Sequence, residues 1–461
     1  MTQWMANWAP YQPRRQHMHQ LWYLAWPLIL SNISVPLLGL VDAAIMGHLD
    51  APQYLGAVAL GATLLSFIYW AFGFLRMGTT GFIARADGAG DKTEVRAIFG
   101  RSCLIALAVG SLLLSLQWPI GVLSFQLLSG DESVEAVAQS YFYTRIWGAP
   151  ATLMIFVIMG VWIGLGQARE LLKLQLFMNG LNMVLDILAA GVLGLGAVGI
   201  AGGTVVAEVI TCGLGFYRLK RFLVENHAVA PEWRTFWPRE RLRQYSQLLA
   251  LLSANTDIMV RTLLLVFAFS FFTNEAAKFG VVALAATHIV LQIMAFTAFF
   301  LDGFAYVAES LSGRSYGAKD KATFSMVLRR TTRLAALAAI GLAGLVLWAG
   351  EALISTLTNL EQVVALSTTL LPVCAAYVLA SFPAFQLDGL FIGTSRTREM
   401  RNASLGSTVV FLCAIAWLGS YFGLIGLWWA MVVFVLVRAV SLWLYFPAVM
   451  KHFTSEGERK S

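Results

Sequence analysis

Five polar side chains in otherwise apolar stretches have the types and spacing that suit proton or cation binding. Asn182 and Asp186 are four positions apart, so they share one face of a helix. Thr204 lies in the next apolar stretch, and Asp42 lies in the first. With a rise of about 1.5 Å per residue, Asp42, Asp186 and Thr204 each lie about 9 to 12 Å from the outer ends of their helices. We therefore expect one polar layer, which Tyr141 can join from the outer start of its own helix.

The two carboxylates of this layer, Asp42 and Asp186, cannot easily both be ionised. Apolar surroundings and a neighbouring negative charge each favour the protonated carboxyl group. Asn182, Thr204 and Tyr141 can hydrogen-bond to one protonation state. The layer is therefore predicted to bind a proton, and Na+ would also suit Asp42, Asn182 and Asp186. A structural network that joins the helices is the alternative interpretation. We expect no other metal and no cofactor.

The first apolar stretch, residues 21–49, combines an acid with two prolines. An ionised Asp at the centre of a spanning helix costs roughly 2.5–3.5 kcal/mol on insertion scales, so Asp42 is easier to keep when it is protonated. Proline removes a backbone hydrogen bond and kinks a helix. Pro27 and Pro36 therefore predict a helix that bends, and we interpret it as the moving, proton-sensing part of a transporter.

Composition indicates a polytopic membrane protein. Of the 461 residues, 58% are hydrophobic and only 12% are charged, whereas soluble domains have about 25% charged residues. A spanning helix needs about 20 mostly apolar residues. Twelve apolar stretches are predicted to span, near 21–48, 54–85, 96–118, 138–165, 171–193, 196–220, 244–271, 279–313, 324–349, 363–393, 402–421 and 423–448.

Basic residues gather in alternate loops and thereby orient the chain. Arginine and lysine cluster before the first stretch, in every second loop and after the last stretch, and the other loops hold almost none. This asymmetry is typical of cytoplasmic loops. We therefore expect both termini to be cytoplasmic in a bacterial inner membrane. The net charge of +7 then faces anionic lipid head groups, and no nucleic-acid partner is expected.

Internal repeats relate the two halves of the chain. Arg85 and the following residues 88–92 (GAGDK) return as Arg314 and residues 317–321 (GAKDK). The other matches are 55–60 with 279–284, 166–169 with 393–396, and 196–199 with 423–426. Matching positions differ by 224 to 229 residues, so six helices are followed by six in the same order.

Because six is an even number, both halves have the same orientation in the membrane. Such parallel repeats are typical of transporters, with the substrate path between the halves. We therefore predict an all-α membrane fold of twelve helices in two six-helix lobes, related by a pseudo-two-fold axis along the membrane normal. The predicted parts are residues 1–225, a cytoplasmic linker at 226–243, and residues 244–461 with a short cytoplasmic tail.

Other charged residues in the apolar stretches are expected to be paired. Asp257 and Arg261 have i, i+4 spacing, which predicts an ion pair on one helix. Asp302 and Glu309 share a helix and act either as a gate or in structural pairs. Four further residues are predicted to be paired inside the bundle: Arg76, Arg145, Glu208 and Arg438.

Motifs favour helix packing over catalysis. We find no zinc-protease, Walker A or nucleophile-elbow motif in the sequence, so we do not expect an enzyme. The G-x-G-x-x-G stretch at 194–199 lies between spanning helices and predicts a tight outer turn. Gly160-x-x-x-Gly164 and Gly199-x-x-x-Gly203 predict close helix contacts.

Several of these features together resemble one family. Pro27, the segment 41–49 (VDAAIMGHL), Asn182-x-x-x-Asp186 and Thr204 are similar to the multidrug and toxic compound extrusion (MATE) family. The stretch FQLDGLFIG at 385–393 resembles its DinF-like branch. The resemblance implies antiporters that exchange cationic, amphipathic drugs for protons or sodium.

The resemblance also implies roles for particular residues. The polar layer described above would be the coupling site, and its protonation would bend the first helix near Pro27. The NorM-like branch instead relies on an acid that matches Asp388, which is a secondary candidate here. Leu38 departs from some relatives, which have a tyrosine one turn before the first-helix acid.

We therefore expect a monomeric, proton-coupled exporter of small cationic or amphipathic drugs that works by alternating access. Sodium-coupled drug antiport and the flipping of lipid-linked precursors are the alternatives. A flippase should have a large cationic cavity, and only four arginines are available inside the bundle for one: Arg76, Arg145, Arg261 and Arg438.

Overall fold

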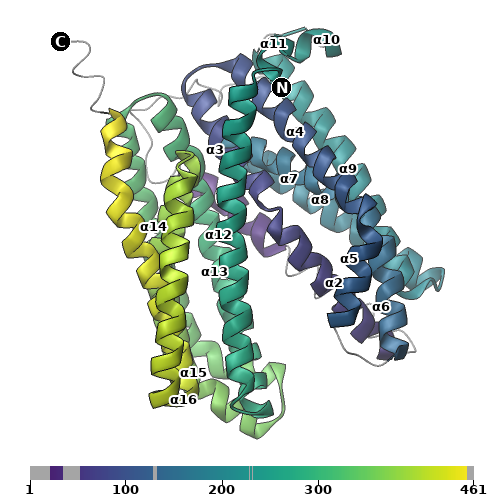
Figure 1. Ribbon diagram of the computed structural model, residues 1–461, viewed down its shortest axis with the longest axis vertical. Helices are drawn as coiled ribbons and strands as arrows, with labels where there is room; N and C mark the ends of the chain where they lie inside the picture. Colours follow the sequence, from purple (N-terminus) through teal and green to yellow (C-terminus); the bar gives the residue numbers. More distant parts are fainter. Residues whose placement is uncertain (1–20, 35–51, 128–131, 228, 231, 454–461) are drawn as a thin grey trace.

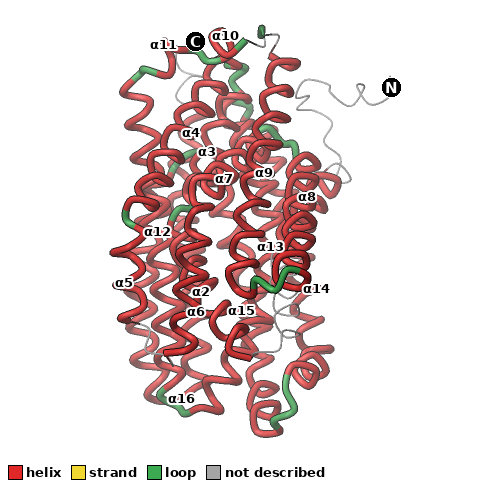
Figure 2. The backbone as a smooth tube through the Cα atoms, turned by 90° about the vertical axis from the view of Figure 1, so that its right-hand side faces the viewer, coloured by secondary structure: helices red, strands yellow, loops and turns green. Residues whose placement is uncertain are grey.

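Long helices run along one direction of the molecule (Figure 1). The computed structural model describes residues 21–34, 52–127, 132–227, 229–230 and 232–453, and it has no strand in these ranges. Ten of the described segments are helices long and apolar enough to cross a membrane. Figure 2 shows the same bundle from the side, with short loops between the helices.

In the first half of the chain, several segments predicted as single spans consist of two helices each. The span predicted at 54–85 breaks at Phe72 and Gly73, between α2 and α3. The span predicted at 138–165 breaks just before Pro150, where a new helix starts because proline fits the first turn. The helices of this half are residues 21–34, α2 (Pro52–Ala71), α3 (Phe74–Gly88), α4 (Lys92–Ser115), α5 (Gln117–Leu127), α6 (Glu132–Arg145), η1 (Ile146–Gly148), α7 (Ala149–Gly164), α8 (Ala168–Asp186), η2 (Ile187–Val192) and α9 (Gly196–His227).

The second half has longer, less interrupted helices. They are α12 (Tyr245–Ala277), α13 (Val281–Gly317), α14 (Lys321–Leu357), α15 (Glu361–Gly393) and α16 (Thr397–Met450). The short helices α10 (Trp233–Phe236) and α11 (Arg239–Leu242) precede them, and η3 (Lys451–Phe453) follows. The last two predicted spans form α16, which reverses at Gly423, where φ is 60° and ψ is −138°. Glycine readily adopts such a conformation. Phe411 and Phe434 from the two arms pack with ring centroids 5.0 Å apart, so α16 provides two spans.

Two large hydrophobic cores and a smaller cluster around Phe324 and Phe391 lie within the described residues of these halves. One is built mainly from helices before residue 224, and the other from residues 268–439. Between them, α10 and α11 pack against α4. Arg96 Nη1 donates to the Phe236 carbonyl of α10 at 3.4 Å, and Arg101 Nη2 donates to the Arg241 carbonyl of α11 at 2.6 Å. The boundaries of the linker predicted at 226–243 stay a prediction.

The two halves meet near the end of the molecule that carries α10 and α11, which we call the basic end (top of Figure 1). A Cβ at Gly88 would lie 2.0 Å from the Arg314 carbonyl oxygen, and a Cβ at Gly317 would lie 2.0 Å from that of Arg85. These are the residues that the sequence repeat pairs, so equivalent glycines pack reciprocally across the pseudo-two-fold axis. At the opposite end, the ribbons of the halves diverge.

The close contacts predicted from the two G-x-x-x-G motifs are confirmed. A Cβ at Gly160 would lie 2.5 Å from the Arg76 carbonyl oxygen, and one at Gly164 would lie 2.8 Å from the Ile83 side chain, so both glycines bring α7 against α3. In α9, a Cβ at Gly199 would lie 3.0 Å from the Ala189 carbonyl carbon. Small residues thus allow these backbones to approach closely.

The predicted ion pair between Asp257 and Arg261 is wrong. Asp257 binds Arg401 of α16 at 2.6 Å, and Arg261 binds Asp388 of α15. Both side chains lie on one face of α12, as their spacing requires, but neighbouring helices supply opposite charges to each of them. Tertiary packing therefore replaces the local pair.

The other predicted pairings inside the bundle are confirmed. Arg145 binds Glu208 at 2.6 Å, and Arg438 binds Asp388 at 3.2 Å. Arg76 of α3 binds Glu309 of α13 at 3.3 Å, which joins the two halves.

Candidate functional site

A polar stripe runs along one face of α8. Gln175, Asn179, Asn182 and Asp186 follow at intervals of four, three and four residues, so their side chains point the same way. Gln175, Asn182 and Asp186 are buried, with at most 5% of their surface exposed. Gln175 Nε2 donates to Asn179 Oδ1 at 3.0 Å. The stripe is therefore a row of polar groups on one helix face inside an apolar lobe.

The crossing of α8 and α9 brings three of the predicted residues together. Asn182 Nδ2 donates to Thr204 Oγ1 at 2.9 Å, and Thr204 Oγ1 donates to the Ile200 carbonyl at 2.9 Å. Asp186 is fully buried beside Gly203, where a Cβ would lie only 2.6 Å from Asp186 Oδ1. Gly203 thus leaves the space that the carboxylate occupies.

Tyr141 lies on α6 at the same level as this crossing. Arg145, one turn further along α6, binds Glu208, which is one turn beyond Thr204 on α9. Because α6 and α9 are two spans apart, they run in the same direction, and Tyr141 is therefore level with Thr204. The Tyr141 ring packs against Gly61 of α2, where a Cβ would lie 2.7 Å from Tyr141 Cδ1.

The first helix contacts both halves of the molecule. Asn179 Nδ2 donates to Ser34 Oγ at 3.0 Å, which joins residues 21–34 to α8. On the other side, Asn32 Nδ2 donates to the Phe299 carbonyl of α13 at 3.4 Å. Pro27 is buried within this helix, which continues through it. Residues 21–34, which precede Asp42 in the sequence, are therefore anchored between the lobes.

Two of the predicted site residues lie outside the described residues. These are Asp42, the first-helix acid, and Pro36, the second predicted hinge. Asp42 follows Ser34 by eight positions in the sequence. Their roles stay predictions.

A π-helix directly follows Asp186. Residues Ile187–Val192 form η2, a π-helix, in which backbone hydrogen bonds of i→i+5 spacing widen the helix. Such segments often occur at functional sites. A Cβ at Gly199 of α9 would lie 3.0 Å from Ala189 of η2, so the widened turn packs directly on α9.

Asp388, the secondary candidate, lies in the other lobe and between two arginines. It is buried on α15 and pairs with both Arg261 of α12 and Arg438 of α16. Asp302, one of the two α13 acids predicted as a gate or a structural pair, is partly exposed and makes no ion pair with any described residue. Glu309, the other, is buried against Arg76.

The site also contains residues that the sequence analysis missed. Gln175 and Asn179 extend the stripe, and the i, i+4 spacing back from Asn182 and Asp186 could have found them. Gly203 was assigned to helix packing alone. The π-helix has no simple sequence signal, because its residues are as apolar as those of an ordinary spanning helix.

Fold and site together define a class of protein. Two lobes of helices related by an internal repeat, with buried carboxylates inside, are typical of a secondary transporter. The MatE family model matches the chain twice, over residues 27–188 and 258–418. The chain therefore belongs to the MatE family, and the predicted repeat is confirmed.

Individual relatives agree with this assignment. The chain is 37% identical to DNA damage-inducible protein F of Escherichia coli (strain K12) over 425 residues, which cover 92% of this chain and 90% of that protein. It is 22% identical to a probable multidrug resistance protein NorM of Photorhabdus laumondii, over 93% of this chain and 95% of that protein. The DinF-like resemblance is therefore confirmed.

A solved structure confirms the fold. It is described as the outward-facing conformation of a multidrug resistance MATE family transporter of the MOP superfamily. It matches with a TM-score of 0.84 and 21% identity over 96% of this chain and 98% of that one. The chain is thus a multi-pass membrane transporter with the predicted twelve-helix, two-lobe fold, and not an enzyme.

Proposed function

We propose that this protein exports small cationic or amphipathic drugs in exchange for protons, and that Asp42 and Asp186 carry the coupling protons. The observation that supports this most directly is the buried stripe on α8, with Asp186 enclosed against Gly203 and beside the Asn182–Thr204 hydrogen bond. A carboxylate enclosed in apolar surroundings is a group at which a proton or a small cation can be bound and released.

The first helix can transmit the protonation state of this site to the rest of the molecule. Residues 21–34 bind α8 through Ser34 and bind α13 of the other lobe through Asn32. A change in charge next to α8 therefore acts on a helix that already touches both lobes. Pro27 weakens this helix at its centre, so bending there offers a route from protonation to displacement of bound drug.

The cycle we propose uses the lobe contact at the basic end. There, Gly88 and Gly317 bring the halves into backbone contact, and the basic loops predict that this side is cytoplasmic. Protonation from outside would displace drug outward, and release of the proton inside would reset the transporter. Alternating access then consists of opening and closing this contact.

Sodium-coupled antiport is the alternative that the same geometry permits. Asn182 Oδ1 is buried and has no hydrogen-bond partner in the described part of the chain, and oxygen atoms are the ligands that Na+ prefers. A lipid-linked precursor flippase is less favoured. The four arginines considered for its cavity, Arg76, Arg145, Arg261 and Arg438, all pair with acids in the bundle.

An accumulation assay tests the proposal in cells. Bacteria that lack their own drug exporters would express either the wild type, Asp42→Asn or Asp186→Asn, with protein amounts in the membrane matched by immunoblot. We expect the wild type to lower ethidium accumulation and both variants to lose this effect. Ethidium export at the wild-type level by both variants would refute the coupling site.

A further inference from the structure

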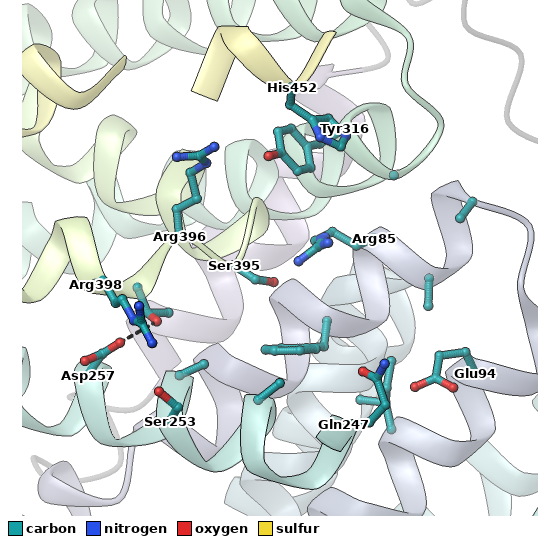
Figure 3. A pocket seen from close by; sticks show the side chains of 18 of the residues that line it. Arg85, Glu94, Gln247, Ser253, Asp257, Tyr316, Ser395, Arg396, Arg398 and His452 are labelled. Atoms are coloured by element: carbon teal, nitrogen blue, oxygen red, sulfur yellow. Dashed lines mark hydrogen bonds between the residues drawn. The ribbon is translucent and has the colours of Figure 1, made fainter. Parts of the chain in front are cut away.

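A large cavity opens at the basic end between the two lobes (Figure 3). Its volume is about 970 Å³, and it is lined by residues of α3, the start of α12, the end of α13 and the turn between α15 and α16. It lies far along the helices from the polar stripe on α8. Four cationic side chains line it: Arg85, Lys319, Arg396 and Arg398.

The pseudo-two-fold axis relates this cavity to a second site, which we call the filled site because a carboxylate of the protein itself occupies it. In the filled site, Arg314 binds Asp87 at 2.7 Å. A Cβ at Gly166 would lie 2.9 Å from Arg314 Nη1, so the guanidinium also rests on that turn. Arg314 is thus held by a carboxylate from the other lobe and by a turn without a side chain.

The twin of each residue is found 229 positions away. Arg85 corresponds to Arg314, and Tyr316 corresponds to Asp87. The α15–α16 turn repeats the α7–α8 turn hydrogen bond for hydrogen bond, which pairs Ser395 with Gly166. Both have positive φ, 55° and 68°. This corrects the sequence alignment of that loop, which used an offset of 227.

The cavity therefore lacks the carboxylate that Asp87 supplies in the filled site. The Arg85 guanidinium lies 5.7 Å from the ring centroid of Tyr316 and makes no hydrogen bond or ion pair with any described residue. The Ser395 hydroxyl is buried, and it too lacks a hydrogen-bond partner in the described ranges. Tyr316 itself is held in place by stacking on His452, with ring centroids 4.0 Å apart (Figure 3).

The acids that line the cavity do not neutralise Arg85. Among the described residues, four carboxylates line it, and each is already in an ion pair with a cation other than Arg85. The pairs are Asp91 with Arg241, Glu94 with Arg101, Asp257 with Arg401, and Glu399 with Arg396. Arg398 is exposed at the cavity and makes no ion pair with a described residue. The free charge in the cavity is therefore positive.

From this asymmetry we infer that the cavity binds a phosphate group, held by Arg85 and the Ser395 hydroxyl, with Arg398 nearby. Arginine and hydroxyl donors suit phosphate oxygens, and guanidinium binds them in a bidentate manner. The start of α16, where no side chain caps the helix, adds amide donors on the same side. The anion takes the place that Asp87 holds in the filled site. It would link Arg85 of one lobe to the α15–α16 turn of the other.

The phosphate group can come from an anionic phospholipid of the adjoining leaflet or from a soluble phosphate ester, and two arms of one experiment distinguish them. In the first arm, full-length protein in pure phosphatidylcholine nanodiscs is titrated with inorganic phosphate and its thermal unfolding is followed. In the second arm, nanodiscs in phosphate-free buffer contain increasing proportions of phosphatidylglycerol, and the lipid retained by the protein is counted by native mass spectrometry.

Two variants test the residues, and a third controls for net charge. Arg85→Gln removes the central donor. Tyr316→Asp introduces the carboxylate that Asp87 provides in the filled site, and this carboxylate would form an ion pair with Arg85 in place of the phosphate. Arg221→Gln removes a positive charge from an exposed position on α9 that does not line the cavity. We expect saturable binding by the wild type in at least one arm, about tenfold weaker in Arg85→Gln and Tyr316→Asp, and unchanged in Arg221→Gln.

Each result then has a definite meaning. Saturation in the phosphate arm alone assigns a soluble ligand, and saturation in the lipid arm alone assigns a head group. Wild-type protein that saturates in neither arm would overturn the inference. So would wild-type affinity in both Arg85→Gln and Tyr316→Asp, or an equal loss in Arg221→Gln. None of these measurements depends on drug transport, so the site can fail while the proposed function stands.

Discussion

Asp186 owes its environment to the residue that faces it. Gly203 is the position on α9 where a side chain would enter the space of the Asp186 carboxylate, since a Cβ there would lie 2.6 Å from Oδ1. The adjacent Gly202 has open space, with nothing within 4 Å of its Cβ position. The two glycines therefore provide a matched pair for testing the site without changing any polar group.

We predict that Gly203→Ala lowers ethidium export at least about tenfold and that Gly202→Ala leaves it unchanged. The added methyl displaces the carboxylate and disturbs the Asn182–Thr204 hydrogen bond, worth about 1 kcal/mol in itself. Helix propensity rises equally in both variants, so it cannot explain a difference between them. Equal export by Gly203→Ala and Gly202→Ala would show that the enclosure of Asp186 has no role.

The Arg145–Glu208 pair stabilises the same lobe. Glu208 accepts from Arg145 Nη2 at 2.6 Å and from Thr152 Oγ1 at 2.7 Å, and it is buried. Glu208→Gln would leave the Arg145 charge buried without a counter-charge. Breaking such a pair from one side costs about 3–5 kcal/mol, so we predict a clear fall in the thermal unfolding midpoint in detergent.

The exposed pair Arg221–Glu225 on α9 serves as the control for this change. Its side chains are 66% and 59% exposed, and water screens such pairs. Glu225→Gln should leave the unfolding midpoint where it is. A midpoint for Glu208→Gln as high as that of Glu225→Gln would mean that the buried pair contributes little to stability.

At the residue scale, the sequence predicted which charged residues are buried more successfully than it predicted which residues they pair with. Asn182, Asp186 and Thr204 meet as their spacing and depth indicate, because helix period and rise are fixed quantities. Partners across helices are not fixed by spacing, and Arg261 shows this. It binds Asp388 on α15, a residue 127 positions away whose direction no periodicity in α12 could reveal.

At the scale of elements, the long apolar stretches were predictable and their breaks were not. Hydrophobicity identifies a span but does not show where its helix bends, as it does between α2 and α3. The π-helix after Asp186 likewise has no sequence signal. The reversal at Gly423 is the exception, because the spans predicted at 402–421 and 423–448 separate there. The repeated GAGDK and GAKDK segments, in contrast, signalled a real contact, because Gly88 and Gly317 pack reciprocally.

This contact leads to a prediction for the helices that form it. Gly88→Ala together with Gly317→Ala should push the lobes apart at the basic end, because each Cβ would lie 2.0 Å from a carbonyl oxygen. Spin labels would replace Arg221 on α9 and Lys321 on α14, which are both exposed, in a variant without the native cysteines. Pulsed electron paramagnetic resonance would then measure the distance between the two labels. We expect a population with a longer distance.

Gly341→Ala on α14 is the matched control for this measurement. Nothing lies within 4 Å of its Cβ position, so its distance distribution should equal that of the parent protein. If the double variant also keeps the parent distribution, the lobe contact is not set by these glycines, and the proposed opening at this end loses its support.

At the scale of the whole molecule, the two lobes share a fold but divide the chemistry. The first lobe holds the buried stripe that ends at Asp186, whereas at the offset of 229 the second-lobe counterparts of Asn182 and Asp186 are the buried, apolar Phe411 and Ile415. The second lobe instead holds Asp388 between two arginines. Ion pairs with both arginines already hold the Asp388 carboxylate, so the asymmetry favours coupling through the first lobe.

The most direct test of this account measures proton movement with purified protein. Liposomes with an acidic interior and a pH-sensitive dye would contain the wild type, Asp42→Asn or Asp186→Asn, and ethidium would be added outside with and without sodium. We predict ethidium-triggered proton release by the wild type in both conditions and none by either variant. Ethidium uptake without proton release, or release that persists in both variants, would contradict proton coupling through Asp42 and Asp186.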